Sequence, residues 1–124
     1  MVRQATKERA GTVHRAGVAD EPVDCAHLHR VTLGDQGLQR ELLGLFDGQA
    51  ALLIARMREA DQTNAGTLAH TLKGSALGIG AIGVAQAAEA FERAANGRDR
   101  DLALNHLAQA VALARTKIAE MLRV

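Results

Sequence analysis

Aromatic residues are almost absent from this sequence, which has two phenylalanines and neither tryptophan nor tyrosine among its 124 residues. The aromatic and β-branched residues that favour strands are therefore scarce, whereas the helix-favouring Ala, Leu, Gln, Glu and Arg abound. This balance predicts an all-helical domain with an aliphatic core. It also excludes the aromatic platforms on which many proteins stack nucleic-acid bases.

The sequence also lacks an excess of charge of either sign. Fifteen basic residues stand against fourteen acidic ones, which gives a formal net charge of +1. Without an electrostatic excess we expect no binding to nucleic acid and none to an anionic membrane surface. No apolar run approaches the ~20 residues needed to span a bilayer, and the N-terminus lacks the hydrophobic segment of a secretory signal.

Only one cysteine is present, so a disulfide within the chain is excluded and a reducing compartment is favoured. Cys25 is expected to be a small buried apolar residue. Together with the missing signal and membrane segments, this cysteine usage predicts a cytoplasmic protein.

The order of turn and capping residues predicts the domain organisation. Residues 1–21 are charged with few large apolar groups, which predicts a flexible N-terminal tail, and residues 22–124 are expected to form one helical domain. Its predicted helices are a short one over about 24–32 and four long ones over about 36–59, 64–79, 81–96 and 99–123. Short connections make neighbouring helices antiparallel. The predicted fold class is therefore all-α, an antiparallel up-down-up-down four-helix bundle with a short additional N-terminal helix.

Apolar stripes at helical spacing identify the expected core. In the 36–59 helix the stripe consists of Leu38, Leu42, Leu45, Phe46, Gln49, Leu53 and Met57. In the 64–79 helix it consists of Ala65, Leu68, Leu72, Ala76 and Ile79. In the 81–96 helix it consists of Val84, Ala88, Phe91 and Ala95. Asn96-Gly97 is expected to stop that helix, and Asp99 or Asp101 to cap the last one.

One histidine has an unusual setting in the run Ala-His-Thr-Leu-Lys-Gly-Ser. Lys73 and Gly74 follow His70 by three and four positions, so all three share one helix face. Gly66 and Gly78 extend the glycine row in both directions. Each interior glycine costs roughly 1 kcal/mol relative to alanine. A helix that accepts this cost repeatedly around one imidazole is expected to keep that ring open to something large.

An imidazole with an unperturbed pKa of ~6.5 is suited to carrying a phosphoryl group, because one ring nitrogen offers a lone pair at neutral pH. The other nitrogen then needs an acceptor for its proton. In a hairpin about Gly80, Glu92 comes level with His70, and Glu89 is the second choice. Lys73 would balance the charge of the phosphoryl oxygens.

Other roles are considered for these residue types. Glu92 could instead be an exposed ion-pair partner of Arg93 or Arg56. His27 and His29 point apart on a helix, so no metal pair is expected. Two further histidines are expected at the surface, His14 and His106. The sequence has no nucleotide-binding loop and no acidic cluster for Mg²⁺, so a complete phosphotransfer site is not expected in this chain alone.

The segment from Leu68 to Glu92 resembles histidine-containing phosphotransfer (HPt) domains of bacterial multistep phosphorelays. The pattern is A-H-x-L-K-G-S, then G-A, then an apolar-rich helix that ends in glutamate, and the resemblance extends over roughly residues 22–122. It implies that His70 is the phosphoacceptor, Lys73 the conserved lysine and Gly74 the small residue that opens the ring. Glu92 matches an acidic position that hydrogen-bonds the imidazole in chemotaxis-kinase phosphotransfer domains.

The resemblance implies a phosphorelay shuttle and not an enzyme. His70 would accept a phosphoryl group from a receiver-domain aspartate of a hybrid histidine kinase and pass it to an aspartate of a response regulator. The receiver would supply the catalytic aspartates and Mg²⁺, so no cofactor or metal of this chain's own is expected. The expected partner-binding residues are Gly66, Thr67, Gly74, Ser75, Leu77 and Gly78.

Two alternatives remain open at this point. The chain could be the dimerisation and phosphotransfer domain of a histidine kinase, or a regulatory bundle that binds a receiver without accepting phosphate. Kinase domains of that kind usually build the bundle from two chains. Four long helices in one chain therefore favour a monomer.

Overall fold

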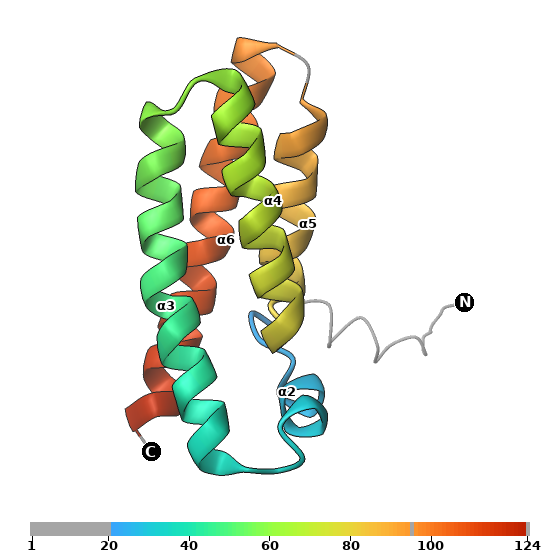
Figure 1. Cartoon of the computed structure of the whole chain (residues 1–124), viewed down its shortest axis with the longest axis vertical. Helices are drawn as coiled ribbons and strands as arrows, with labels where there is room; N and C mark the ends of the chain where they lie inside the picture. The colour runs from blue at the N-terminus through green and yellow to red at the C-terminus, as the bar shows by residue number, and fades with distance from the viewer. Residues whose placement is uncertain (1–20, 95, 124) are drawn as a thin grey trace, which may run out of the picture.

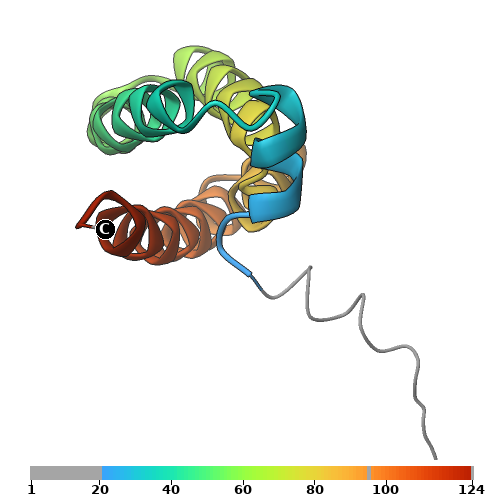
Figure 2. The same cartoon turned by 90° about the horizontal axis from the view of Figure 1, so that it is seen from below.

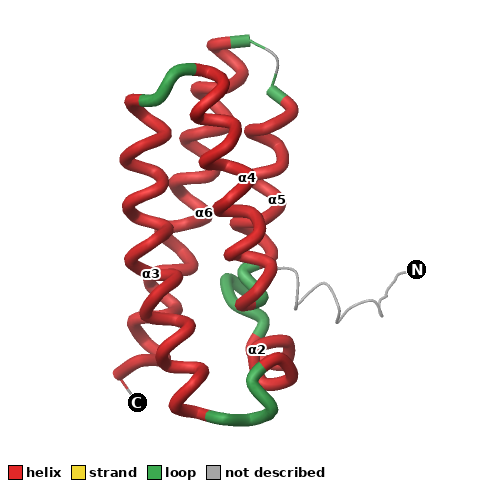
Figure 3. The backbone as a smooth tube through the Cα atoms, in the orientation of Figure 1, coloured by secondary structure: helices red, strands yellow, loops and turns green. Residues whose placement is uncertain are grey.

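The computed structural model describes residues 21–94 and 96–123, and all regular structure within these two ranges is helical (Figure 1, Figure 3). The helices are α2 (Cys25–Val31), α3 (Gln36–Glu59), α4 (Gln62–Ile79), α5 (Ile82–Arg93) and α6 (Gly97–Arg123). The four long helices run up, down, up and down, and α2 lies across the end where α4 turns into α5 (Figure 1, Figure 2). The all-α bundle with a short additional helix is confirmed.

Two sequence expectations fall on residues that are not described. The predicted N-terminal tail lies outside the described ranges except for its last residue, Glu21. Ala95, which we expected to face inward, also lies outside them.

Aspartate side chains start three of the helices. Asp24 accepts a hydrogen bond from the backbone N–H of His27 at 3.1 Å and caps α2. Asp35 does the same at the start of α3, at 3.0 Å, and Asp61 at the start of α4, at 2.8 Å. Each cap satisfies a backbone donor that the first turn of a helix leaves unpaired. Because Asp61 is a cap, α4 begins two residues earlier than the sequence analysis predicted.

The boundary between α5 and α6 also differs from the prediction. We expected Asn96-Gly97 to end a helix, but α5 already ends at Arg93 and α6 begins at Gly97. The side chain of Asn96 accepts from the backbone N–H of Asp99 at 2.7 Å. Asn is common both before the start of a helix and after its end. Asn96 was expected to end a helix, whereas here it precedes the start of α6.

A continuous aliphatic core fills the bundle, with Leu28, Leu72, Leu107 and Ile118 among its fully buried side chains. The predicted stripe on α3 was partly wrong. Its buried residues are Leu43, Phe46, Ala50, Leu53 and Met57. Leu38, Leu45 and Gln49 are instead exposed. Both stripes have near-heptad spacing, so periodicity alone does not decide which one faces the core.

The short helix α2 and the segment before it cover the end of the core with Leu28 and Val23, which are almost completely buried. Cys25, expected to be buried, is exposed at the first position of α2. No helix in the described ranges has an apolar stretch long enough to cross a membrane.

The turn between α4 and α5 requires glycine. Gly80 ends α4 with a φ of +82°, in the left-handed region that residues with a Cβ rarely adopt. The backbone N–H of Asp24 donates to the carbonyl oxygen of Gly80 at 2.8 Å. A Cβ atom at Gly80 would lie 2.9 Å from the Asp24 carbonyl oxygen. Glycine is therefore required at this turn for two reasons, namely its positive φ and the close approach of Asp24, the residue before α2.

Polar side chains join α3 to α6 across the first-to-last seam of the bundle. Arg115 on α6 donates to Asp47 on α3 at 2.8 Å, and this carboxylate raises the pKa of Arg115 through the hydrogen bond and the opposite charge. Further down the seam, Arg40 donates to the backbone carbonyl of Leu122 at 2.7 Å.

Candidate functional site

The histidine singled out by the sequence lies on the solvent side of α4. The side chain of His70 is 72% exposed, and its Nδ1 atom lies 3.2 Å from Oε2 of Glu92 on α5. The turn at Gly80 brings these residues level although 22 positions separate them in the chain. The contact expected from the hairpin is therefore present. Arg93, one of the two alternative partners considered for Glu92, pairs with Glu89.

This contact assigns different tasks to the two ring nitrogens. An ionised carboxylate can only accept hydrogen bonds, so in a neutral His70 ring the Nδ1–H group donates a hydrogen bond to Glu92. The remaining nitrogen, Nε2, then carries the lone pair of the neutral imidazole. The arrangement presents a nucleophilic nitrogen on an exposed ring.

Lys73 lies between two carboxylates of α5. Its Nζ atom is 3.9 Å from Oε1 of Glu92 and 4.0 Å from Oε1 of Glu89. Glu92 therefore faces the imidazole with one oxygen and the ammonium with the other. Partly exposed ion pairs contribute little to the stability of the fold. The cluster does, however, place charged side chains next to His70.

Two of the predicted glycines leave open space near the histidine. At Gly74 and at Gly78, an added Cβ atom would meet no other atom within 4 Å. Gly66, expected to clear the other side of the ring, has a different setting. It is half-buried, and a Cβ there would lie 3.5 Å from a guanidinium nitrogen of Arg100. The open surface thus runs from Gly74 toward the end of α4.

The other predicted contact residues border this open surface. Thr67 is exposed and its hydroxyl donates to the backbone carbonyl of Thr63 at 3.3 Å. Leu77 is 46% exposed. Ser75 and Gly78 line a shallow cavity of about 270 Å³ between α4 and α3. The α3 side of this cavity is formed by Leu42, Leu45, Phe46 and Gln49.

Leu45 is a residue of this surface that sequence reasoning missed, because its heptad position suggested the core. It is 66% exposed at the rim of the cavity. The signal was present in the sequence, since the apolar positions of α3 form a band wider than one helix can bury between its two neighbours.

Metal ligation has no support in the described ranges, where no group of three or more His, Cys, Asp or Glu side chains is placed to hold an ion. His27 and His29 both lie on α2, and the ring of His29 packs against Gly34. His106 is exposed on α6, and His14 lies outside the described residues.

Comparison with known proteins agrees with the geometry. The crystal structure of a rice protein, described as a candidate histidine-containing phosphotransfer protein, superposes with a TM-score of 0.58 at 18% identity. The match covers 90% of this chain and 81% of the rice chain, and at this identity it supports the fold alone. Among curated proteins, none matches this sequence. The Hpt domain family model matches residues 36–123, from the first residue of α3 to the last of α6. The chain therefore belongs to the Hpt domain family.

Proposed function

We propose that this protein is a phosphorelay shuttle that carries the phosphoryl group on Nε2 of His70. A receiver domain of a hybrid histidine kinase donates the group, and a receiver domain of a response regulator accepts it. Membership of the Hpt family supports a histidine phosphotransfer role. The observation that carries the assignment to one residue is the exposed His70 ring with Nδ1 against Glu92, beside open glycines.

The transfer step needs no proton to leave the imidazole. The Nε2 lone pair attacks the phosphorus of the donor's aspartyl phosphate, the N–P bond forms, and the bond from phosphorus to the aspartate oxygen breaks. The donor carboxylate departs with the electron pair. The proton on Nδ1 stays in its hydrogen bond, and Glu92 stabilises the positive charge that develops on the ring. Passing the group to the next aspartate reverses these steps.

Lys73 assists by balancing the charge of the phosphoryl oxygens. Its ammonium is near the histidine but held by two carboxylates, so in this proposal it turns toward the phosphoryl group when that group arrives. Phosphoryl transfer depends chiefly on positioning and charge stabilisation. The partner receiver supplies the remaining parts, namely its own aspartates and the Mg²⁺ that they bind. This chain then requires no cofactor of its own.

The receiver docks on the open face of α4 and on the neighbouring part of α3. Gly74 and Gly78 admit its surface close to the ring, since nothing lies within 4 Å of a Cβ at either position. Leu77 on α4 and Leu45 at the rim of the cavity on α3 offer exposed apolar contact. Thr67 and Ser75 complete the docking surface at its edges.

A direct test uses a panel of receiver domains from the source organism, each loaded with radiolabelled phosphate, and the His70→Gln variant. Wild-type protein is expected to take up label that is acid-labile and base-stable, as a phosphoramidate is. The variant is expected to keep its helical circular dichroism and to take up none. Label on the variant would assign the acceptor to another residue.

The same experiment addresses the second reading, a regulator that binds receivers without accepting phosphate. Such a protein would bind a receiver in the panel with wild-type His70 intact and yet remain unlabelled. That result would overturn the proposal. No observation on the described residues favours this reading over the shuttle.

A further inference from the structure

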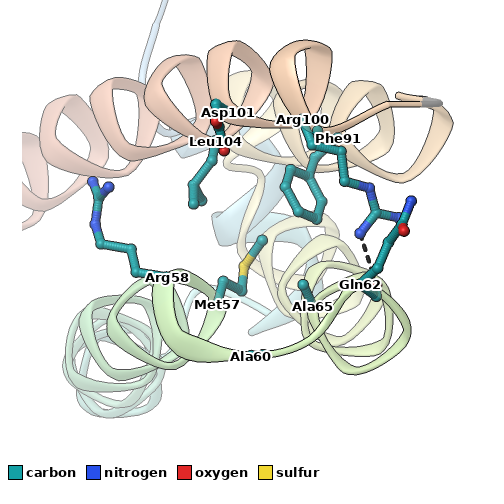
Figure 4. A pocket seen from close by; sticks show the side chains of 10 residues that line it. Met57, Arg58, Ala60, Gln62, Ala65, Phe91, Arg100, Asp101 and Leu104 are labelled. Carbon is teal, nitrogen blue, oxygen red and sulfur yellow. Dashed lines mark hydrogen bonds between the residues drawn. The ribbon is translucent and has the colours of Figure 1, made fainter.

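One arginine of α6 joins the two helices that carry the functional pair (Figure 4). Arg100 donates through Nη1 to the backbone carbonyl of Gln62, the first residue of α4, at 2.7 Å. Its Nε donates to the carbonyl of Ala94, just beyond α5, at 3.4 Å. Its guanidinium also lies over the ring of Phe91 on α5, 4.6 Å from the ring centroid. A single side chain thus contacts both helices.

These contacts adjoin the functional pair along the chain. Phe91 immediately precedes Glu92, and its ring is 2% exposed, so it fixes the rotation of α5 at that point. Gly66, which faces the Arg100 guanidinium, precedes His70 by one helical turn. Arg100 therefore hydrogen-bonds to α4 at Gln62, about two turns before His70, and faces Gly66 one turn before it. On α5 it lies over Phe91, the residue next to Glu92.

The surroundings of Arg100 favour a defined geometry. The residue is half-buried at the edge of a cavity of about 260 Å³ whose apolar lining includes Met57 and Leu104. A planar guanidinium can stack on an aromatic ring and donate along its edge at the same time, which a lysine ammonium cannot do. A Cβ atom at Gly66 would already be in van der Waals contact with the guanidinium, 3.5 Å from one of its nitrogens.

We infer that Arg100 is a positioning residue for the His70–Glu92 contact, holding the N-terminal end of α4 against the C-terminal end of α5. Its relevance to phosphoryl transfer rests on the function proposed above, but the contact itself can be observed in the free protein. The turn at Gly80 fixes the hairpin at one end, and Arg100 fixes it at the other. His70 and Glu92 lie between these two anchor points.

The test replaces Arg100 by methionine, which keeps a long apolar stem and removes the guanidinium. The ¹⁵N shifts of the His70 ring nitrogens report which nitrogen holds the proton. We expect the Arg100→Met variant to lose part of the Nδ1-protonated form. We also expect it to accept phosphate roughly tenfold more slowly, because small misplacements of reacting groups lower the rate of a reaction. Arg100→Lys keeps the positive charge without the planar guanidinium group. It should recover little of the Nδ1-protonated form and little of the transfer rate.

The matched control is Arg115→Met, which removes an arginine of the same helix that bridges α6 to α3 and not to the α4–α5 pair. Any general loss of stability should be similar in Arg100→Met and Arg115→Met. The shifts of the His70 ring nitrogens should change in Arg100→Met and stay at their wild-type values in Arg115→Met. All spectra are recorded well below the unfolding temperature of each variant.

A second variant keeps the inference testable if Arg100→Met fails to fold. Gly66→Leu introduces a good helix former whose side chain would occupy the place of the Arg100 guanidinium. It should change the His70 shifts in the same direction, and the double variant should show no further change, because both act on one contact. Wild-type His70 shifts in both single variants would overturn the inference, whatever the outcome of the transfer assay.

Discussion

At the scale of single residues, we expect the carboxylate of Glu92 to determine which tautomer the His70 ring adopts. Replacing Glu92 by alanine removes the acceptor of the Nδ1 proton, which lies 3.2 Å away. We expect a mixture of tautomers in the free ring and a transfer rate lower by up to about tenfold, or ~1.4 kcal/mol. Nitrogen-15 NMR and rapid-quench transfer kinetics measure the two effects.

Glu92→Gln is the companion variant, because its amide oxygen can accept the same hydrogen bond without the negative charge. It should retain the tautomer and lose part of the rate. If Glu92→Ala has wild-type ring-nitrogen shifts, Glu92 is not the residue that orients His70.

In the proposed function, Lys73 contributes charge at the phosphoryl group and little to the stability of the fold. Lys73→Ala is expected to slow transfer by about tenfold, or ~1.4 kcal/mol of transition-state stabilisation, without abolishing it, because in the proposed mechanism a metal ion of the partner receiver carries more of the charge. Stability should change little, since both ion pairs of Lys73 are partly exposed. Single-turnover transfer from a labelled receiver measures the rate.

Glu89→Gln is the control for this prediction. It removes one carboxylate near Lys73 and leaves the contact between His70 and Glu92 in place. We expect its transfer rate to stay within about threefold of wild type, since exposed pairs of this kind are worth less than ~1 kcal/mol. An unchanged rate in Lys73→Ala would remove the lysine from the mechanism.

Open space at Gly74 is expected to matter for docking. Gly74→Leu places a side chain one turn from His70 where no atom now lies within 4 Å. Transfer should be blocked sterically while helicity is kept or increased. Gly44→Leu is the matched control, since Gly44 is an equally unobstructed glycine on α3 outside the proposed docking surface. Equal transfer rates in the two variants would place the docking surface elsewhere.

The sequence predicted the parts of the site that depend on distance along one hairpin. His70, Lys73 and Glu92 lie on two consecutive helices, so counting from Gly80 was enough to bring them level. Arg100 could not be found in this way. Its contacts to Gln62 and Phe91 depend on how a third helix packs, and no local pattern records that packing.

At the scale of helices, the turn at Gly80 has the strictest sequence requirement. Gly80→Ala would place a Cβ on a residue with a positive φ, and this atom would lie only 2.9 Å from the carbonyl oxygen of Asp24. We expect it to lower the free energy of unfolding by about 2 kcal/mol or more, as measured by urea denaturation. Gly83→Ala is the control, because it adds a methyl group inside α5 where nothing lies within 4 Å. It should be neutral or stabilising by up to ~1 kcal/mol.

Helix positions were predicted well where a capping aspartate precedes an apolar stripe, as for α2 and α3. Prediction was poorer where one residue type serves two purposes. Asn96 can end one helix or begin the next, and only the hydrogen bond to Asp99 decides between them. Leu45 fitted a core stripe equally well, and the packing of α3 between its two neighbours left it exposed.

At the scale of the whole molecule, the bundle is completed within one chain. Its core draws buried side chains from α2 to α6, including Leu72 and Ile118. We therefore expect a monomer in solution, measured as the mass of one chain by light scattering over a range of concentrations. A stable dimer would favour the histidine-kinase dimerisation alternative, in which two chains share the bundle.

The placement of contacts along the chain leads us to expect that the α4–α5 hairpin is more persistent than the α3–α6 seam. His70 and Glu92 are 22 positions apart on one hairpin, whereas Arg40 and Leu122 on the α3–α6 seam are 82 apart. Closing the longer loop costs more chain entropy. Native-state hydrogen exchange should therefore find that the α3–α6 seam opens at lower free energy than the α4–α5 hairpin. The histidine and its carboxylate would then remain paired through excursions that separate the first and last long helices of the bundle.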